Sequence, residues 1–261
     1  MRFRSVVIVV AAYLVATLIA SVILNPSHPR AFAVTPIVLA LIAGLVAALT
    51  LGPLARRLQF PVATRLGVLV VVIYALGTLS NEVEAVLFIK NAGLRGFLTG
   101  LVLAIALGSA LAFTSQPDRT DAPFKVARLS WLWRVPVAAV VWVPIYLSFA
   151  AADAPFVHRY YHESGTTFTI PGNGVLASAE LSRGLLHALV LGVLAALLAR
   201  GRRATWFWLA LSFAALNAWL PLVQHTAWPY YLRAANIVEV TCDAVVYAGV
   251  VVVLLLRHER S

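Results

Sequence analysis

Residues 175–199 have the sequence VLASAELSRGLLHALVLGVLAALLA, and this stretch decides what kind of protein the chain is. It is longer than the run of about 20 apolar residues that an α-helix needs to cross the hydrocarbon core of a membrane. It also contains Glu180, Arg183 and His187. Because an ionisable side chain inside the bilayer costs about 2.5–3.5 kcal/mol on insertion scales, the stretch predicts a transmembrane helix that carries either a functional site or a buried ion pair.

The composition of the whole chain agrees with a membrane protein. Of the 261 residues, 62% are hydrophobic and 11% are charged, and the mean hydropathy is +0.91. Soluble domains contain about 45–50% apolar and about 25% charged residues, so an ordinary soluble enzyme and a disordered chain are excluded. The net charge of +10 predicts no nucleic-acid partner, because the basic residues stand at the ends of apolar runs, where they set topology. We therefore predict an all-α, polytopic integral membrane protein surrounded by a lipid bilayer.

Eight segments are long and apolar enough to be transmembrane helices. Apolar similarity apart, no internal repeat is evident, and we treat residues 1–261 as a single transmembrane domain. The first segment is too long for the apolar region of a signal peptide, so we expect it to be retained. Residues 153–174 are predicted to form an extracytoplasmic loop that is long enough to act as a lid. The predicted spans are approximately 5–24, 34–54, 65–89, 95–114, 132–152, 175–199, 206–226 and 233–256.

The distribution of lysine and arginine predicts the orientation. Fourteen of the 20 basic residues fall on the side that holds both termini and six on the other side, which places both termini in the cytoplasm. Lysine occurs only at Lys90 and Lys125, and an arginine-rich, alanine-rich composition suggests a bacterial source. We therefore expect the bacterial cell membrane as the location. The single cysteine, Cys242, excludes an intrachain disulfide.

Polar residues gather in the outer half of four predicted spans, while the inner halves of these spans are apolar. Because a helix rises by about 1.5 Å per residue, the polar groups of the third, sixth, seventh and eighth spans lie at similar depths. This arrangement predicts a polar pocket that opens outward and is closed below by apolar packing. The candidate residues are Glu82 and Glu84 on the third span, Glu180, Arg183 and His187 on the sixth, Asn217 on the seventh, and Asn236, Glu239 and Asp243 on the eighth.

Helical spacing places most of these residues on shared faces. The sixth-span and eighth-span groups each follow an i, i+3, i+7 pattern, and Asn217 and Gln224 are seven residues apart, so each set occupies one side of its helix. Glu82 and Glu84 are two residues apart and diverge by about 200° around the helix. We therefore expect at most one of these two glutamates to point squarely into the pocket.

The residue types suggest roles within the pocket. Glu180, His187, Glu239 and Asp243 are predicted catalytic acid–base groups or metal ligands. Substrate binding is assigned to Arg183, which would hold an anionic head group or balance the acids, and to Asn217, Asn236, Glu82 and Glu84. The alternative for Glu180 and Arg183 is an intrahelical ion pair with no other role. No metal or cofactor is identified by these patterns.

Three functions are compatible with this sequence. The first is a membrane-embedded enzyme or binding protein for an amphiphilic, lipid-like substrate or small molecule. The second is a structural or accessory subunit whose polar residues join helices or receive a partner. The third is an ion- or proton-coupled transporter, which needs access from both sides of the membrane, and the apolar inner halves of the spans argue against it.

Overall fold

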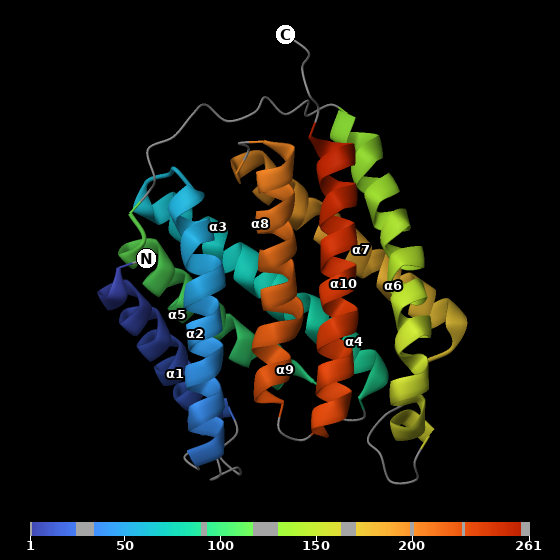
Figure 1. Cartoon of the computed structure of the whole chain (residues 1–261), viewed down its shortest axis with the longest axis horizontal. Helices are drawn as coiled ribbons and strands as arrows, with labels where there is room; N and C mark the ends of the chain where they lie inside the picture. Colours follow the sequence, from blue (N-terminus) through green and yellow to red (C-terminus); the bar gives the residue numbers. More distant parts are fainter. Residues whose placement is uncertain are drawn as a thin grey trace.

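The computed structural model describes residues 2–24, 34–89, 93–116, 130–162, 171–198, 201–225 and 228–256, and every regular element in these ranges is helical. Figure 1 shows the helices packed side by side, with their connections gathered at the two ends of the bundle. Eight helical segments are long and apolar enough to cross a membrane. The predicted all-helical, eight-span organisation is confirmed at this level.

Six spans are single helices and two are composite. The single helices are α1 (Phe3–Leu24), α2 (Val34–Arg57), α5 (Leu94–Thr114), α6 (Trp131–His162), α7 (Asn173–Leu198) and α10 (Tyr230–Leu255). The third span consists of α3 (Val62–Tyr74), the π-helical turn η2 (Ala75–Leu79) and α4 (Ser80–Phe88). The seventh span consists of α8 (Arg202–Ala214), the π-helical turn η4 (Ala215–Trp219) and α9 (Leu220–Gln224).

The loop predicted over residues 153–174 is shorter in the structure. Helix α6 continues through Asp153 and Pro155 to His162, and α7 begins at Asn173. Hydropathy indicates where the apolar part of a span ends, whereas a helix ends where its backbone hydrogen bonding ends. The predicted end of α6 at residue 152 is therefore too early. Residues 163–170 lie outside the described part of the chain, so the lid stays an expectation.

The two π-helical turns change the faces that regular helical spacing predicted. A π-helical turn contains more residues than an α-helical turn, so it rotates the following residues around the helix axis. Asn217 lies within η4, and Gln224 follows it in α9. The Gln224 amide Nε2 donates to the Tyr13 hydroxyl of α1. The prediction that Gln224 and Asn217 share one side of their helix is therefore wrong.

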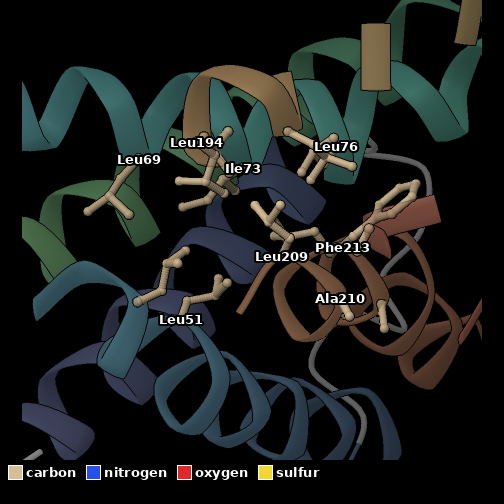
Figure 2. Packing of buried hydrophobic residues seen from close by; sticks show 14 of the residues in the cluster. Leu51, Leu69, Ile73, Leu76, Leu194, Leu209, Ala210 and Phe213 are labelled. Carbon is tan, nitrogen blue, oxygen red and sulfur yellow. The ribbon is translucent and has the colours of Figure 1, made fainter. Parts of the chain in front are cut away.

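One end of the bundle is closed by apolar packing. We call the end where α1 begins and α10 ends the terminal end, and the opposite end, where α4 and α9 finish, the distal end. Figure 2 shows buried side chains from α2, α3, η2, α7 and α8 packed against one another; the labelled residues are Leu51, Leu69, Ile73, Leu76, Leu194, Leu209, Ala210 and Phe213. This cluster lies between the polar residues described next and the terminal end.

Candidate functional site

Arg183 on α7 is the centre of a buried polar network. Its Nη1 lies 2.7 Å from Glu180 Oε1, and its Nη2 lies 2.8 Å from Glu84 Oε2 on α4. Its Nε donates to Ser80 Oγ over 3.3 Å. The Arg183 side chain is 3% exposed, so two carboxylates and one hydroxyl replace the water that a guanidinium would otherwise bind. This network joins α7 to the first turn of α4.

Glu180 and His187 lie behind Arg183. The indole Nε1 of Trp142 on α6 donates to Glu180 Oε2 over 2.9 Å. His187 Nε2 is 2.8 Å from Ser80 Oγ, and the imidazole ring packs edge-on against Trp142 and Phe213. Both Glu180 and His187 are fully buried. They therefore hold Arg183 and Ser80 in place, and neither belongs to the cavity wall on which the sequence analysis placed them as catalytic groups.

A cavity of about 190 Å³ lies on the distal side of this network. It extends to residues at the distal ends of the helices, including Ile89 and Trp228. The structure brings seven of the nine predicted site residues to its wall: Glu82, Glu84, Arg183, Asn217, Asn236, Glu239 and Asp243. Convergence of the third, sixth, seventh and eighth spans on one polar cavity therefore matches the arrangement that their depths and faces predicted.

Glu82 and Glu84 occupy different parts of the cavity wall. Glu84 reaches Arg183, as described above. The carboxylate of Glu82 packs against Gly96 of α5, where a Cβ atom would collide with it. Only Glu84 is therefore engaged with the Arg183 network, which is consistent with the divergence expected for two residues that are two positions apart.

Two deeply buried oxygen atoms on the wall are unpaired. Asp243 is 1% exposed and Asn217 is 4% exposed. Among the described residues, neither Asp243 Oδ1 nor Asn217 Oδ1 has a hydrogen-bond partner. Because leaving a buried acceptor unsatisfied costs about 1–3 kcal/mol, each of these two atoms has room for one more partner, which can be a water molecule, a donor group or a cation.

The electrostatics of the cavity are dominated by acids. Its wall carries four acidic side chains, those of Glu82, Glu84, Glu239 and Asp243. Arg183 is the one lysine or arginine among the described lining residues, and it is already paired with Glu84 and Glu180. The predicted role of Arg183 in balancing the acids fits this geometry better than binding of an anionic head group.

A second depression lies between α6 and α10, which run side by side in Figure 1. It has a volume of about 550 Å³, and its wall includes Phe149, Phe156, Tyr230 and Val238. Glu239 lines both this groove and the cavity. We call this depression the lateral groove. The wall of the groove is mostly apolar but also contains the buried Asp153, and Val238 is 63% exposed on the outside of the helix bundle.

The sequence analysis missed three members of the site. Ser80, Trp142 and Tyr146 contact the Arg183 network, and the Arg183 guanidinium lies 5.6 Å from the centre of the Tyr146 ring. The available signal was the spacing of Trp142 and Tyr146, which are four residues apart in the middle of an apolar span and each carry a polar group. Among the described residues, no group of three histidine, cysteine or acidic side chains is arranged to hold a metal ion.

Comparison of this chain with protein-family models, with curated proteins and with solved structures finds no match.

Proposed function

We propose that this protein binds an amphiphilic molecule with a cationic head group inside the outer half of the membrane. The observation that carries the proposal is the pair of unpaired, buried oxygen atoms on Asp243 and Asn217, which lie on a wall whose acids outnumber its one paired arginine. A cation in this cavity gains charge-assisted contacts in a poorly solvated place, where such contacts are stronger than in water.

Aromatic side chains add a second feature that favours a cation. Trp142, Tyr146 and Trp228 belong to the cavity wall, and the rings of Trp142 and Tyr146 already lie close to the Arg183 guanidinium, so the ring contact with a bound ammonium group is assigned to Trp228. The faces of aromatic rings attract ammonium groups, by about 2 kcal/mol or more when the cation is desolvated. Substituted ammonium groups suit such a wall well, because their apolar substituents lose little hydration when they enter it.

The sizes of the cavity and the lateral groove indicate how the ligand divides between them. Drug-sized ligands occupy pockets of about 300–1,000 Å³, so a cavity of about 190 Å³ accommodates a head group and not a whole lipid. The lateral groove has a volume of about 550 Å³, and Glu239 belongs to the walls of both the groove and the cavity. An apolar tail in the groove and a head group at Glu239 and Asp243 would bury both parts of the ligand.

The remaining functions receive less support from the geometry. Of the four predicted catalytic residues, only Glu239 and Asp243 line the cavity, so any proton transfer to a bound ligand would fall to these two. Transport requires a path to the other side of the membrane, and buried apolar residues of α2, α3, α7 and α8 pack together on the terminal side of the cavity.

The proposal is tested by measuring the binding of dodecyltrimethylammonium to the full chain in lipid nanodiscs. We expect saturable binding that weakens by about tenfold or more in Asp243→Asn, the loss of one charge-assisted contact being worth about 1.5–3 kcal/mol. Glu239→Gln should weaken binding in the same direction. The matched control is Asp121→Asn. This substitution removes an equal charge from the segment between the fourth and fifth predicted spans, which the sequence assigns to the cytoplasmic side of the membrane.

Two results would contradict the proposed function. One is equal binding of dodecyltrimethylammonium to the wild type and to Asp243→Asn, with both proteins correctly folded. The other is equal binding of an uncharged dodecyl compound, because that would mean that the lateral groove alone retains the tail and the acids do not recognise the head group.

A further inference from the structure

The four spans at the start of the chain and the four at its end contain matching sequence. Residues 44–58 are GLVAALTLGPLARRL and residues 184–198 are GLLHALVLGVLAALL. The letters G, L, A, L, L, G, L, A and L recur at the same positions in both segments, so Gly44 corresponds to Gly184. Alanine and leucine are abundant throughout the chain, so this match alone does not indicate an internal repeat. The packing of the helices that carry the two segments provides the independent observation.

Helix packing is the same in the two sets of spans. Helix α1 packs against α2 and α5, and α6 packs in the same way against α7 and α10. Helix α3 packs against α5, as α8 packs against α10. The third and seventh spans also share an internal irregularity, because α3 and α8 both have 13 residues and both continue into a five-residue π-helical turn that begins with Ala-Leu.

Individual contacts repeat between the two sets. A Cβ atom at Gly44 would lie 3.1 Å from Val10 Cα, and one at Gly184 would lie 2.5 Å from Ala139 O. Both glycines thus allow a close approach to the preceding span, and Val10 on α1 corresponds to Ala139 on α6. The same alignment of α1 with α6 and of α5 with α10 relates two side-chain bonds that tie helix ends together. They are the bond from Ser5 Oγ to the Thr114 carbonyl and the bond from Arg134 Nη1 to the Leu254 carbonyl.

The lipid-facing and buried positions repeat as well. Three leucines on α2 are exposed, and so are their three counterparts on α7; the pairs are Leu41 with Leu181, Leu45 with Leu185, and Leu49 with Leu189. Buried residues of α3 in Figure 2, such as Leu69 and Ile73, have the buried counterparts Leu209 and Phe213 on α8. Because each set contains four spans, both sets have the same orientation in the membrane, as parallel repeats have.

The two sets differ at the charged site. The counterparts of Glu180, Arg183 and His187 are Ala40, Ala43 and Ala47, which are equally buried. The counterpart of Glu84 is Gln224, and that of Asp243 is Leu103. We call the contact of α2 with α9 the first interface and the equivalent contact of α7 with α4 the second interface. The first interface forms without charges, so helix packing of this kind does not require them.

We propose that this chain is an internal duplication of a four-span unit, and that the charges of the second interface were recruited to serve a ligand and not to hold helices together. The inference rests on the proposed function for the identity of that ligand. It opposes the accessory-subunit alternative, in which buried polar residues act only to join helices.

The duplication is tested by distance measurements between spin labels. Replacing the single cysteine by Cys242→Ser gives a cysteine-free background. The exposed pairs Leu45→Cys with Leu98→Cys and Leu185→Cys with Val238→Cys occupy equivalent positions on the two units. We expect superimposable distance distributions. Clearly different distributions would overturn the duplication, whatever the ligand turns out to be.

The recruitment of the charges is tested by giving the second interface the residues of the first. The variant Glu84→Gln, Glu180→Ala, Arg183→Ala, His187→Ala should accumulate as folded, monodisperse protein within about twofold of the wild type. Arg183→Ala alone leaves the carboxylates of Glu84 and Glu180 without a cationic partner, so this variant should accumulate to about one tenth of the wild-type level or less. If the fourfold variant is lost as completely as Arg183→Ala, the charges serve packing and the inference fails.

These outcomes are separable from a failure of the proposed function. Loss of dodecyltrimethylammonium binding by a well-folded fourfold variant supports the inference, because the scaffold then survives without the site. Retained binding at wild-type strength by the same variant would overturn the recruitment of these charges for a ligand, while Asp243→Asn still reports independently on the cationic head-group site.

Discussion

Arg183 shows how a single buried charge is accommodated in an apolar bundle. Its partners come from its own helix, through Glu180, and from α4, through Glu84 and Ser80. Three of the five guanidinium donors are therefore satisfied in fixed geometry, and the ring centres of Trp142 and Tyr146 lie 5.8 Å and 5.6 Å from its Cζ atom. Lysine would supply one point charge and could not bridge both carboxylates and the hydroxyl in this way.

The Arg183 network predicts a severe effect of removing only its cation. Arg183→Ala leaves the buried Glu84 and Glu180 without compensation, and breaking a buried pair in this way costs about 3–5 kcal/mol. Arg183→Lys should fall between Arg183→Ala and the wild type. Thermal unfolding in detergent, followed by loss of monodisperse protein, measures the effect. An Arg183→Ala protein as stable as the wild type would mean that the two acids carry no charge.

At this scale the sequence predicted residue types and faces but not contacts. The i, i+3, i+7 spacing correctly placed Glu180, Arg183 and His187 on one face of α7. It did not distinguish Arg183, which reaches the cavity, from Glu180 and His187, which lie behind it. That difference depends on Trp142 and Ser80, which come from other helices and approach only when the bundle is packed.

At the scale of elements, close helix contact depends on glycine. Gly184 lets α7 approach α6 so closely that a Cβ atom would lie 2.5 Å from Ala139 O and 2.8 Å from Trp142 Cβ. Small residues at helix contacts are the usual means by which membrane helices pack closely, because the hydrophobic effect does not drive helices together within lipid. The contact also positions Trp142 against Glu180.

This contact predicts opposite effects of the same substitution at two glycines. Gly184→Ala must separate α6 from α7 and should destabilise the protein by about 1–3 kcal/mol. Gly67→Ala on α3 is the matched control, since nothing lies within 4 Å of its Cβ position and alanine favours helix by up to about 1 kcal/mol. Thermal unfolding of both variants checks the prediction, and equal stability of the two would contradict the proposed contact.

The π-helical turns are the feature of the elements that the sequence pattern did not predict. Turns η2 and η4 contact each other near the middle of the bundle, and a Cβ atom at Gly77 would lie 3.4 Å from the Leu216 carbonyl. Hydrophobic periodicity assumes about 3.6 residues per turn throughout a helix. It therefore placed Gln224 on the same side of the helix as Asn217, which is wrong because the π-helical turn η4 lies between them.

At the scale of the whole molecule, the polar cavity lies on the distal side of the bundle and the apolar cluster on the terminal side, where Arg65 is also buried. The sequence predicts that the cavity opens outward, because the basic residues favour the other side. In a Cys242→Ser background, Asn236→Cys should react with a membrane-impermeant thiol reagent added outside cells, because Asn236 lines the cavity.

The buried position Leu194→Cys provides the control for this labelling. Leu194 is fully buried in the cluster of Figure 2, so its cysteine should stay unlabelled from both sides of the membrane. Labelling of Asn236→Cys only from the cytoplasmic side would reverse the predicted orientation. Labelling of Leu194→Cys from the cytoplasm would reveal a water path and revive the transporter alternative.

Hydropathy along the chain predicted the eight spans and the half of the bundle in which the polar residues gather. Both are local properties, because the length of an apolar run and the depth of a residue along it follow from helix rise alone. The pairing of Glu84 with Arg183, the unpaired oxygen atoms of the cavity and the equivalence of the two sets of four spans are visible only in the folded bundle. These depend on distances between helices, which packing sets and no single span encodes.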